Sequence, residues 1–296
     1  MLDNDAHMGN IMSLDDNWFT EICNASGSAY SLKVIRELHA EQSEYQHIAV
    51  YETEKFGNLM VIDGFIMLSS RDNFLYHEMM THPVLFSHAA PKRVVIIGGG
   101  DCGTLQQVLR HPVVEQAWQI EIDERVTRLA EQFFPELCAD NHDSRAQLLF
   151  EDGIKWMRER EDNSVDVIIV DSTDPIGPAE GLFGESFYQQ CQRVLAPGGY
   201  LAQQSESPLI HDKLLQEMHH YMRKAGMQDV QIVAFPQPVY PSGWWTATIA
   251  RVDGKVSFAR EAEAKQLAFK TRYYNAELHK AAFVQAQFVK ELLAEK

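Results

Sequence analysis

The chain of 296 residues has few cysteines and no long apolar run. Its four cysteines stand far apart without a C-x-x-C pair, which favours reduced thiols over a disulfide scaffold or a paired-thiol zinc site. No apolar run approaches the roughly 18–20 residues that span a bilayer. The first ten residues, MLDNDAHMGN, are acidic and contain no apolar signal region. These absences predict a cytoplasmic protein that does not associate with a membrane.

Basic residues are also in short supply. The chain has 26 lysines and arginines against 42 aspartates and glutamates, a formal net charge of −16. Because phosphate contacts require a basic surface, we expect no nucleic-acid partner. A cationic substrate is compatible with this excess of negative charge, and so is solubility alone, which is the commoner reason for it.

The pattern of apolar residues divides the chain near residue 80. Residues 1–26 show no clear period and are expected to be partly disordered or packed on a neighbour. Short strands follow between residues 29 and 68, with a hairpin across Asp63-Gly64, a dipeptide favoured in type I′ turns. Residues 1–80 are therefore predicted to form a small antiparallel β domain. It ends in a helix over 74–81 that Pro83 is expected to terminate.

From residue 81 to 296 the pattern predicts an α/β domain with a doubly wound parallel sheet. Strands and helices alternate, and a helix is expected over 276–294. In such sheets ligands bind at the carboxyl ends of the strands. The expected strands cover residues 94–97, 117–122, 147–150, 165–170, 200–203, 230–235 and 244–250.

The segment VVIIGGGDCG, residues 94–103, is the centre of this pattern. A buried strand runs into a glycine loop and then a helix, an arrangement in which glycine lets backbone approach a bound nucleoside. The series Gly98-x-Gly100-x-x-Gly103 fits the dinucleotide fingerprint, but alone it is weak, because tight packing of strand on helix needs the same glycines. The loop lacks a Gly-Lys-Ser/Thr ending and is therefore not a P-loop.

Acidic residues follow four consecutive strands of the predicted sheet. Any one of them could simply cap a helix, but four carboxylates at one edge are harder to explain by capping alone. Glu121 is placed to accept hydrogen bonds from ribose hydroxyls, and Asp152 from an adenine amino group, with Gly153 giving the ring room. The four strand-end carboxylates belong to Asp101, Glu121, Asp152 and Asp171.

The charge of these residues favours a cationic ligand. Asp101 would meet a pyrophosphate in the glycine loop, and a unit charge at 4 Å is worth about 4 kcal/mol at an effective dielectric near 20, repulsive for an anion and attractive for an ammonium. Asp171 and Asp174 stand three residues apart and could bind a substrate ammonium and accept its proton. That proton matters, because an amine of pKa near 10.4 is neutral in only about one molecule per few thousand at pH 7.

Two histidine patterns are not expected to carry chemistry. His77, Glu78 and His82 form H-E-x-x-x-H, in which the histidines lie about 140° apart round a helix, so we expect no zinc site. His219 and His220 are adjacent and are interpreted as surface residues.

Six motifs occur in order along the chain: YHEM at 76–79, IGGGDCG, EID, EDG, DSTDPIGP, and YPSG at 240–243. Together they resemble the polyamine aminopropyltransferases, the spermidine synthases in particular, from roughly Tyr30 to near the C-terminus. The resemblance implies a small N-terminal β domain and a Rossmann-like domain of the methyltransferase type. It also implies transfer of the aminopropyl group of decarboxylated S-adenosylmethionine to a diamine, usually putrescine, which gives spermidine and 5′-methylthioadenosine. Members are usually homodimers or homotetramers, and the resemblance implies neither a metal nor a cofactor, since the donor is a co-substrate.

The resemblance also implies a set of site residues. Asp171 matches the proton acceptor of the family, and Asp101 the residue that holds the aminopropyl ammonium. The donor would further contact Gln46, Gly98, Glu121, Asp152, Gly153 and Pro178, and the amine would contact Tyr76, His77, Asp101, Asp174 and Tyr240.

Departures from the family pattern leave the acceptor open among putrescine, agmatine, cadaverine and spermidine. Cys102 replaces a usual glycine, which an ordinary backbone angle would tolerate. Ser70 and Asn73 replace acidic residues, and Trp244-Trp245 add bulk beside Tyr240, although core packing is the commoner role of tryptophan. Two other classes remain: an S-adenosylmethionine methyltransferase, whose donor carboxylate Asp101 and Asp171 would repel, and a non-catalytic polyamine- or nucleoside-binding protein. The segment 175–185 has the glycines and prolines of a lid.

Overall fold

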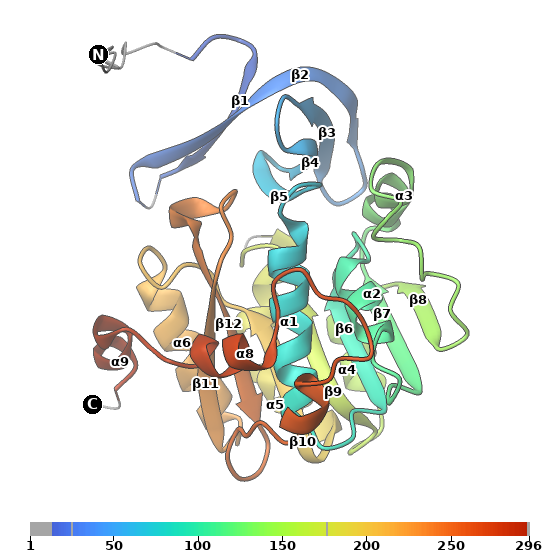
Figure 1. The fold of residues 1–296 in the computed structure, drawn as a ribbon, viewed down its shortest axis with the longest axis vertical. Coiled ribbons are helices and arrows are strands. Elements are labelled where there is room, and N and C mark those ends of the chain that lie inside the picture. The colour runs from blue at the N-terminus through green and yellow to red at the C-terminus, as the bar shows by residue number, and fades with distance from the viewer. Residues whose placement is uncertain (1–13, 25, 176, 295–296) are drawn as a thin grey trace, which may run out of the picture.

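The computed structural model describes residues 14–24, 26–175 and 177–294, so the first thirteen residues lie outside the described part. Figure 1 shows a small sheet above a larger sheet that is flanked by helices. In the described residues, five strands form the small sheet as an antiparallel meander in the order β1-β2-β3-β4-β5. Its strands are β1 (Trp18–Cys23), β2 (Ser28–Gln42), β3 (His47–Thr53), β4 (Gly57–Ile62) and β5 (Phe65–Ser69).

Seven strands of the described region form the large sheet, in the order β11-β12-β10-β9-β6-β7-β8. Strands β10, β9, β6, β7 and β8 are parallel, whereas β12 runs antiparallel to both of its neighbours, so the sheet is mixed. The strands are β6 (Arg93–Gly98), β7 (Gln116–Glu121), β8 (Ala146–Phe150), β9 (Val165–Asp171), β10 (Leu195–Gln204), β11 (Asp229–Pro236) and β12 (Trp244–Arg251).

Helices cover both faces of this sheet and give it two apolar cores. Helices α1 (Asn73–Ser87), α2 (Gly103–Leu109) and α8 (Ala276–Ala282) pack on one face. Helices α4 (Gly153–Glu159), α5 (Glu185–Val194) and α6 (Asp212–Lys224), with the 3-10 turn η1 (Gly177–Phe183), pack on the other. The remaining helical segments are α3 (Glu124–Phe133), η2 (Pro241–Gly243), α7 (Glu261–Ala264) and α9 (Gln287–Leu293).

Helix α3 joins the two sheets. Its apolar face, with Val126, Leu129 and Ala130, packs against Ile48 and Met60 of the small sheet. The small sheet is thereby held over the edge of the large sheet where the parallel strands end, which places the two sheets on opposite sides of one opening.

The expected alternation of strands and helices after residue 93 is confirmed, and so is the hairpin at Asp63-Gly64. Ile62 pairs with Phe65 across the turn, and both turn residues have positive φ, 49° and 87°. The sequence did not indicate β1, and where short strands were expected from residue 29 onward β2 is one long strand, because many residues of both strands are exposed and the apolar alternation is weak. Residues 18–23, which belong to the segment expected to be partly disordered or packed on a neighbour, thus form the edge strand of the small sheet.

Three local expectations were wrong. Pro83 lies inside α1, because almost the whole helix is buried and its packing outweighs the backbone bond that proline removes. The helix expected over 276–294 is two helices, α8 and α9, since Ala286 adopts an extended conformation. His219 is buried on the apolar face of α6 one turn after Leu215, while His220 is exposed.

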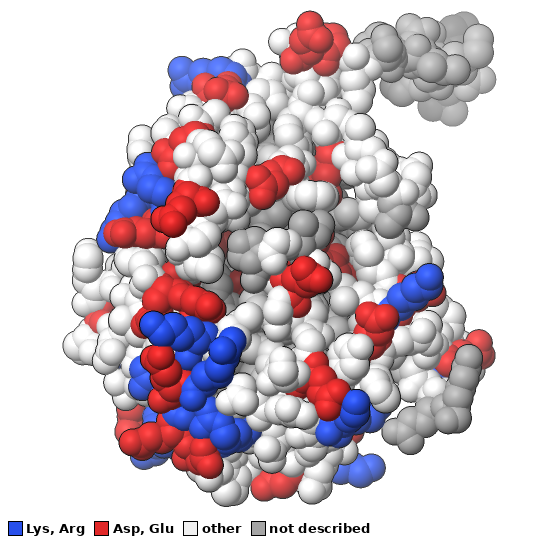
Figure 2. Space-filling view, turned by 180° about the vertical axis from the view of Figure 1, so that it is seen from behind, with Lys and Arg blue, Asp and Glu red and all other residues white. Residues whose placement is uncertain are grey.

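The predicted domain boundary after residue 80 falls within α1, whereas the small sheet ends at Ser69. Among the described residues, no helix is both long enough and apolar enough to cross a bilayer. All four cysteines lie within the described residues and are free thiols. On the face shown in Figure 2, basic side chains lie among acidic ones.

Candidate active site

The carboxyl ends of the parallel strands and the small sheet enclose a cavity. Its free space, open mouth included, is about 980 Å³, which suits a small-molecule ligand. Nine of the predicted site residues line it: Gln46, Tyr76, Gly98, Asp101, Glu121, Asp152, Gly153, Asp171 and Tyr240. We call this space the nucleoside cavity, after the ligand that the sequence predicts. His77 lies behind Asp101, Asp174 lines an adjoining cavity, and Pro178 belongs to η1.

The glycine loop brings backbone against the end of β9. Gly98 has φ 83°, and a Cβ there would lie 2.2 Å from the carbonyl oxygen of Asp171. Gly99 N–H donates to that same oxygen at 2.7 Å. Cys102 has φ 67°, so its backbone angle is not ordinary, and the left-handed conformation is one that glycine would adopt without strain.

Asp171 is held by two hydroxyl groups. Tyr76 donates to its Oδ1 and Thr104 to its Oδ2, both at 2.6 Å. Burial, together with the nearby charge of Asp101, raises the pKa of Asp171 above its usual value. An oriented carboxylate of raised pKa at a cavity wall is suited to accept a proton from an amine. Sequence reasoning missed Thr104, although it is the second residue of the helix that follows the glycine loop.

Asp101 is paired with a buried histidine. Its Oδ2 lies 3.0 Å from Nε2 of His77, and its Oδ1 accepts from Gly103 N–H at 2.8 Å. Burial alone would lower the pKa of His77, but the adjacent Asp101 carboxylate outweighs it and raises the pKa above its usual value. Gly103 is required by this packing, because a Cβ there would lie 2.1 Å from Cε1 of His77.

Glu121 and Asp152 also line the nucleoside cavity. Burial is the main cause that raises the pKa of Glu121, to about 7. Asp152 also caps α4, since its Oδ1 accepts from Ile154 N–H at 2.8 Å. The capping interpretation of Asp152 is thus correct, and the same residue lines the cavity with Gly153.

A smaller space adjoins the nucleoside cavity and shares Tyr76 and Tyr240 with it; we call it the amine cavity, after the second ligand that the sequence predicts. Glu21 and Asp174 line it. Glu206 is buried beside Asp174, and burial, with Asp174 next, raises the pKa of Glu206 well above its usual value. Burial likewise raises the pKa of Glu21 to about 7, although its Oε2 accepts from Ile66 N–H at 2.6 Å.

Neither Glu21 nor Glu206 was assigned a role from the sequence. Glu21 lies in the segment that showed no period, and Glu206 belongs to a stretch without a recognised motif. The available signal for Glu21 was its position in β1. This charged residue is the one buried member of a strand whose other residues are partly or fully exposed.

The described residues contain no group of three or more His, Cys, Asp or Glu side chains arranged to hold a metal ion. The two histidines of H-E-x-x-x-H have separate partners. His77 contacts Asp101, whereas Nδ1 of His82 lies 2.9 Å from Nε2 of His111. Glu78 accepts three backbone N–H groups of the segment 272–274.

Two family models match the chain over adjacent regions. The spermine/spermidine synthase domain matches residues 73–260, and the spermidine synthase tetramerisation domain matches residues 17–70. The chain belongs to the spermine/spermidine synthase family. It is a transferase of that type and carries the family's tetramerisation domain.

Curated relatives and solved structures agree with this membership. The chain is 58% identical to the polyamine aminopropyltransferase of Thioalkalivibrio sulfidiphilus over 283 residues, 95% of this chain and 99% of the relative. It is 59% identical to that of Methylococcus capsulatus over 279 residues, 94% and 98% of the two chains. A spermidine synthase crystallised with the transition-state analogue AdoDATO superposes with a TM-score of 0.90 at 31% identity, covering 96% and 97% of the chains. The enzyme from Thermotoga maritima does so with 0.88 at 31%, covering 96% of each.

The fold is therefore the expected Rossmann-like methyltransferase type with a small N-terminal antiparallel sheet. Of the departures from the family pattern, Trp245 lines the amine cavity, whereas Trp244 packs edge-on against Phe288 with ring centroids 5.5 Å apart. Ser70 lies against Gly57, and Asn73 donates to the backbone oxygen of Ser69.

Proposed function

We propose that the protein transfers the aminopropyl group of decarboxylated S-adenosylmethionine to putrescine and releases spermidine and 5′-methylthioadenosine. The observation that carries this proposal is the position of Asp171. Its carboxylate lines the nucleoside cavity, and the same Tyr76 that donates to it also lines the acidic amine cavity. A base at this junction faces both substrates.

The charges of the nucleoside cavity support the decarboxylated donor. We take Glu121 to bind the ribose hydroxyls and Asp152 with Gly153 to bind adenine, and Asp101 and Asp171 line the same cavity. An ammonium on the donor tail would be attracted by these two carboxylates. The carboxylate of ordinary S-adenosylmethionine would be repelled by several kcal/mol, on the order of 4 for a unit charge at 4 Å.

The amine cavity supports a diamine. Tyr76 and Tyr240 line both cavities and would flank the reacting nitrogen. Glu21 and Asp174 line the amine cavity and offer carboxylates for a second ammonium, with Glu206 buried beside Asp174. A wider outer cleft, of about 1250 Å³ with its open mouth, adjoins the amine cavity and shares Glu21 and Tyr240 with it. A longer amine would extend into this cleft, so acceptor length is the property to measure.

Asp171 takes one proton from the incoming ammonium, and the neutral nitrogen then attacks the propyl carbon attached to sulfur. The C–N bond forms as the C–S bond breaks, and the bonding pair goes to sulfur, whose positive charge disappears. The product nitrogen keeps two protons and the positive charge. Tyr76 and Thr104 hold the carboxylate in place, and alignment of the two substrates supplies much of the acceleration. His77, through its pairing with Asp101, keeps that second carboxylate oriented for the donor ammonium.

The proposal includes no cofactor beyond the co-substrate, no metal, a cytoplasmic location, and a homodimer or homotetramer. The tetramerisation domain matched at residues 17–70 supports self-association. Nucleic acid and membranes are not among the proposed partners.

The test is release of methylthioadenosine from decarboxylated S-adenosylmethionine, with putrescine, cadaverine, agmatine and spermidine offered separately. We expect release that depends on the amine and is fastest with putrescine. Faster release with spermidine or agmatine would show that this amine, and not putrescine, is the preferred acceptor. Methyl transfer from ordinary S-adenosylmethionine would favour the methyltransferase, and nucleoside binding without turnover would favour the binding protein.

A further inference from the structure

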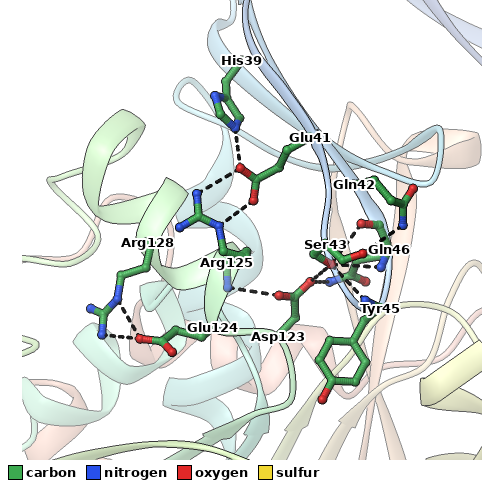
Figure 3. A network of polar contacts seen from close by, with 10 residues as sticks. All are labelled: His39, Glu41, Gln42, Ser43, Tyr45, Gln46, Asp123, Glu124, Arg125 and Arg128. Carbon is green, nitrogen blue, oxygen red and sulfur yellow. Dashed lines mark hydrogen bonds and ion pairs between the residues drawn. The ribbon is translucent and has the colours of Figure 1, made fainter.

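The loop between β2 and β3 is attached to the start of α3 through a single carboxylate (Figure 3). Oδ2 of Asp123 accepts from Oγ of Ser43 at 2.6 Å and from Nε2 of Gln46 at 3.0 Å. Its Oδ1 caps α3 by accepting from Arg125 N–H at 3.0 Å. Only 2% of Asp123 is exposed, so these donors take the place of water.

This contact determines which end of the Gln46 amide the ligand meets. An ionised carboxylate can only accept hydrogen bonds, so Gln46 must turn its NH₂ group toward Asp123. Gln46 also lines the nucleoside cavity, and its carbonyl oxygen is the group left for a bound nucleoside. Such an oxygen can accept a hydrogen bond from a ligand hydroxyl group. The carboxylate of Glu121, which lines the same cavity, can do so as well.

Asp123 reaches Glu121 as well, but through its backbone. Asp123 N–H donates to Oε1 of Glu121 at 2.9 Å. Substitution of the side chain leaves this backbone bond available, so a side-chain variant isolates the contact with Ser43 and Gln46.

A second contact attaches strand β2 itself to α3, and its residues do not line the nucleoside cavity. The guanidinium of Arg125 forms two hydrogen bonds with Glu41, at 2.6 and 2.9 Å, and Nε2 of His39 lies 2.8 Å from Glu41. Figure 3 shows this ion pair on the far side of Asp123 from Gln46. It provides a matched control, because it holds the two sheets together without orienting a cavity residue.

We propose that Asp123 is a positioning residue for the nucleoside donor, which acts by fixing the Gln46 amide with its carbonyl oxygen available to a ligand hydroxyl. The inference rests on the proposed function, because it takes the ligand to be an adenine nucleoside. It predicts that Asp123 contributes to binding of the donor and not to the chemical step.

The first test is Asp123→Asn, read by calorimetric binding of 5′-methylthioadenosine and by steady-state kinetics. Asparagine caps helices as well as aspartate does, so α3 keeps its cap. Its amide offers an NH₂ group where the carboxylate stood, so Gln46 must turn over and present its own NH₂ to the ligand. We expect the Kd for methylthioadenosine and the KM for the donor to rise at least 10-fold, with kcat within 2-fold. Glu41→Gln is expected to change the Kd by less than 2-fold.

The second test is rescue by exchange of the two groups. Gln46→Glu places two carboxylates face to face and is expected to raise the Kd at least 10-fold. In the double variant Gln46→Glu/Asp123→Asn the new amide again donates to a carboxylate, whose other oxygen faces the ligand, and binding should return to within 3-fold of wild type. If Asp123 had a purely structural role, the double variant would bind methylthioadenosine more weakly than either single variant.

Equal losses in Glu41→Gln and Asp123→Asn, or a double variant no tighter than either single one, would overturn the inference. If Asp123→Asn does not fold, as judged by circular dichroism, Gln46→Glu and its rescue still decide the question. Wild-type protein that binds no methylthioadenosine would count against the proposed function itself. Normal wild-type binding with unaffected variants would count against the positioning role alone.

Discussion

At Asp171, four neighbours and burial set the basicity of one carboxylate in opposing directions. Burial and Asp101 raise its pKa, while the charge of His77 and the hydroxyl groups of Thr104 and Tyr76 stabilise the ionised form and lower it. The balance lets the residue hold a proton taken from an amine and still return to its charged form between turnovers.

Removal of the Thr104 hydroxyl tests this balance. In Thr104→Val, Oδ2 of Asp171 loses a donor, so the pKa of Asp171 should rise further. Because the base must be ionised to act, the acidic limb of the kcat profile should move to higher pH, with kcat at neutral pH lower by about 10-fold. Thr104→Ser keeps a hydroxyl and should leave the limb in place. A limb that moves to lower pH in Thr104→Val would contradict this account.

The sequence predicted those residues of the cavity whose location follows from their place at the end of a strand. Asp101, Glu121, Asp152 and Asp171 follow successive strands, and parallel strands end at one edge. The partners of these residues were not predictable, because the packing of α1 and α2 on the large sheet brings Thr104 to Asp171 and His77 to Asp101. Cys102 shows the same limit, since its positive φ has no sequence signal once glycine is replaced.

At the scale of elements, α1 and α2 lie against each other where His77 meets Gly103. The ring of His77 fills the space that any side chain at Gly103 would need. The approach of the two helices therefore also determines where Asp101 is held.

Gly103→Ala should force the His77 ring away from Asp101. A buried Cβ 2.1 Å from a packed ring requires the helices to move, so we expect a loss of about 1–3 kcal/mol in the free energy of unfolding and a large loss in kcat/KM. Urea denaturation and initial rates measure the two effects. Gly184→Ala is the control without a clash, because a Cβ at Gly184 meets nothing within 4 Å, and since Gly184 is the N-cap of α5 it should cost less than about 1 kcal/mol of stability. Similar losses in both variants would show that the contact with His77 is unimportant.

The elements that the sequence predicted well have strong apolar periodicity or a diagnostic turn, as in the hairpin at Asp63-Gly64. Those that it missed owe their structure to tertiary contacts. Pro83 remains helical because α1 is buried, and β1 exists because it pairs along β2 from Trp18 to Cys23.

At the scale of the whole molecule, acidic groups concentrate where the two sheets meet. Glu21 and Glu121 have pKa values raised to about 7, and both are buried. A carboxyl group with a raised folded-state pKa contributes stability that is fully present below its unfolded value, 4.5, and is lost as pH rises through the folded value. The unliganded protein should therefore lose stability from these groups between about pH 4.5 and 7.

A cationic ligand should reverse this loss, because it favours the ionised carboxylates. We expect putrescine with methylthioadenosine to raise the Tm more at pH 8 than at pH 5.5, as measured by scanning calorimetry. Glu21→Gln should reduce the difference between the two pH values. An equal rise at both pH values would contradict the assignment of this acidic region to amine binding.

Kinetics of Asp171→Asn, together with its binding of methylthioadenosine, test the central claim most directly. The amide keeps the size of the carboxylate but cannot take a proton, so kcat for amine-dependent methylthioadenosine release should fall by about 10²–10⁴. The Kd for methylthioadenosine should stay within about 3-fold, because Glu121 and Gln46 remain. A variant that retains more than a tenth of wild-type kcat would show that Asp171 is not the base at the junction of the two cavities.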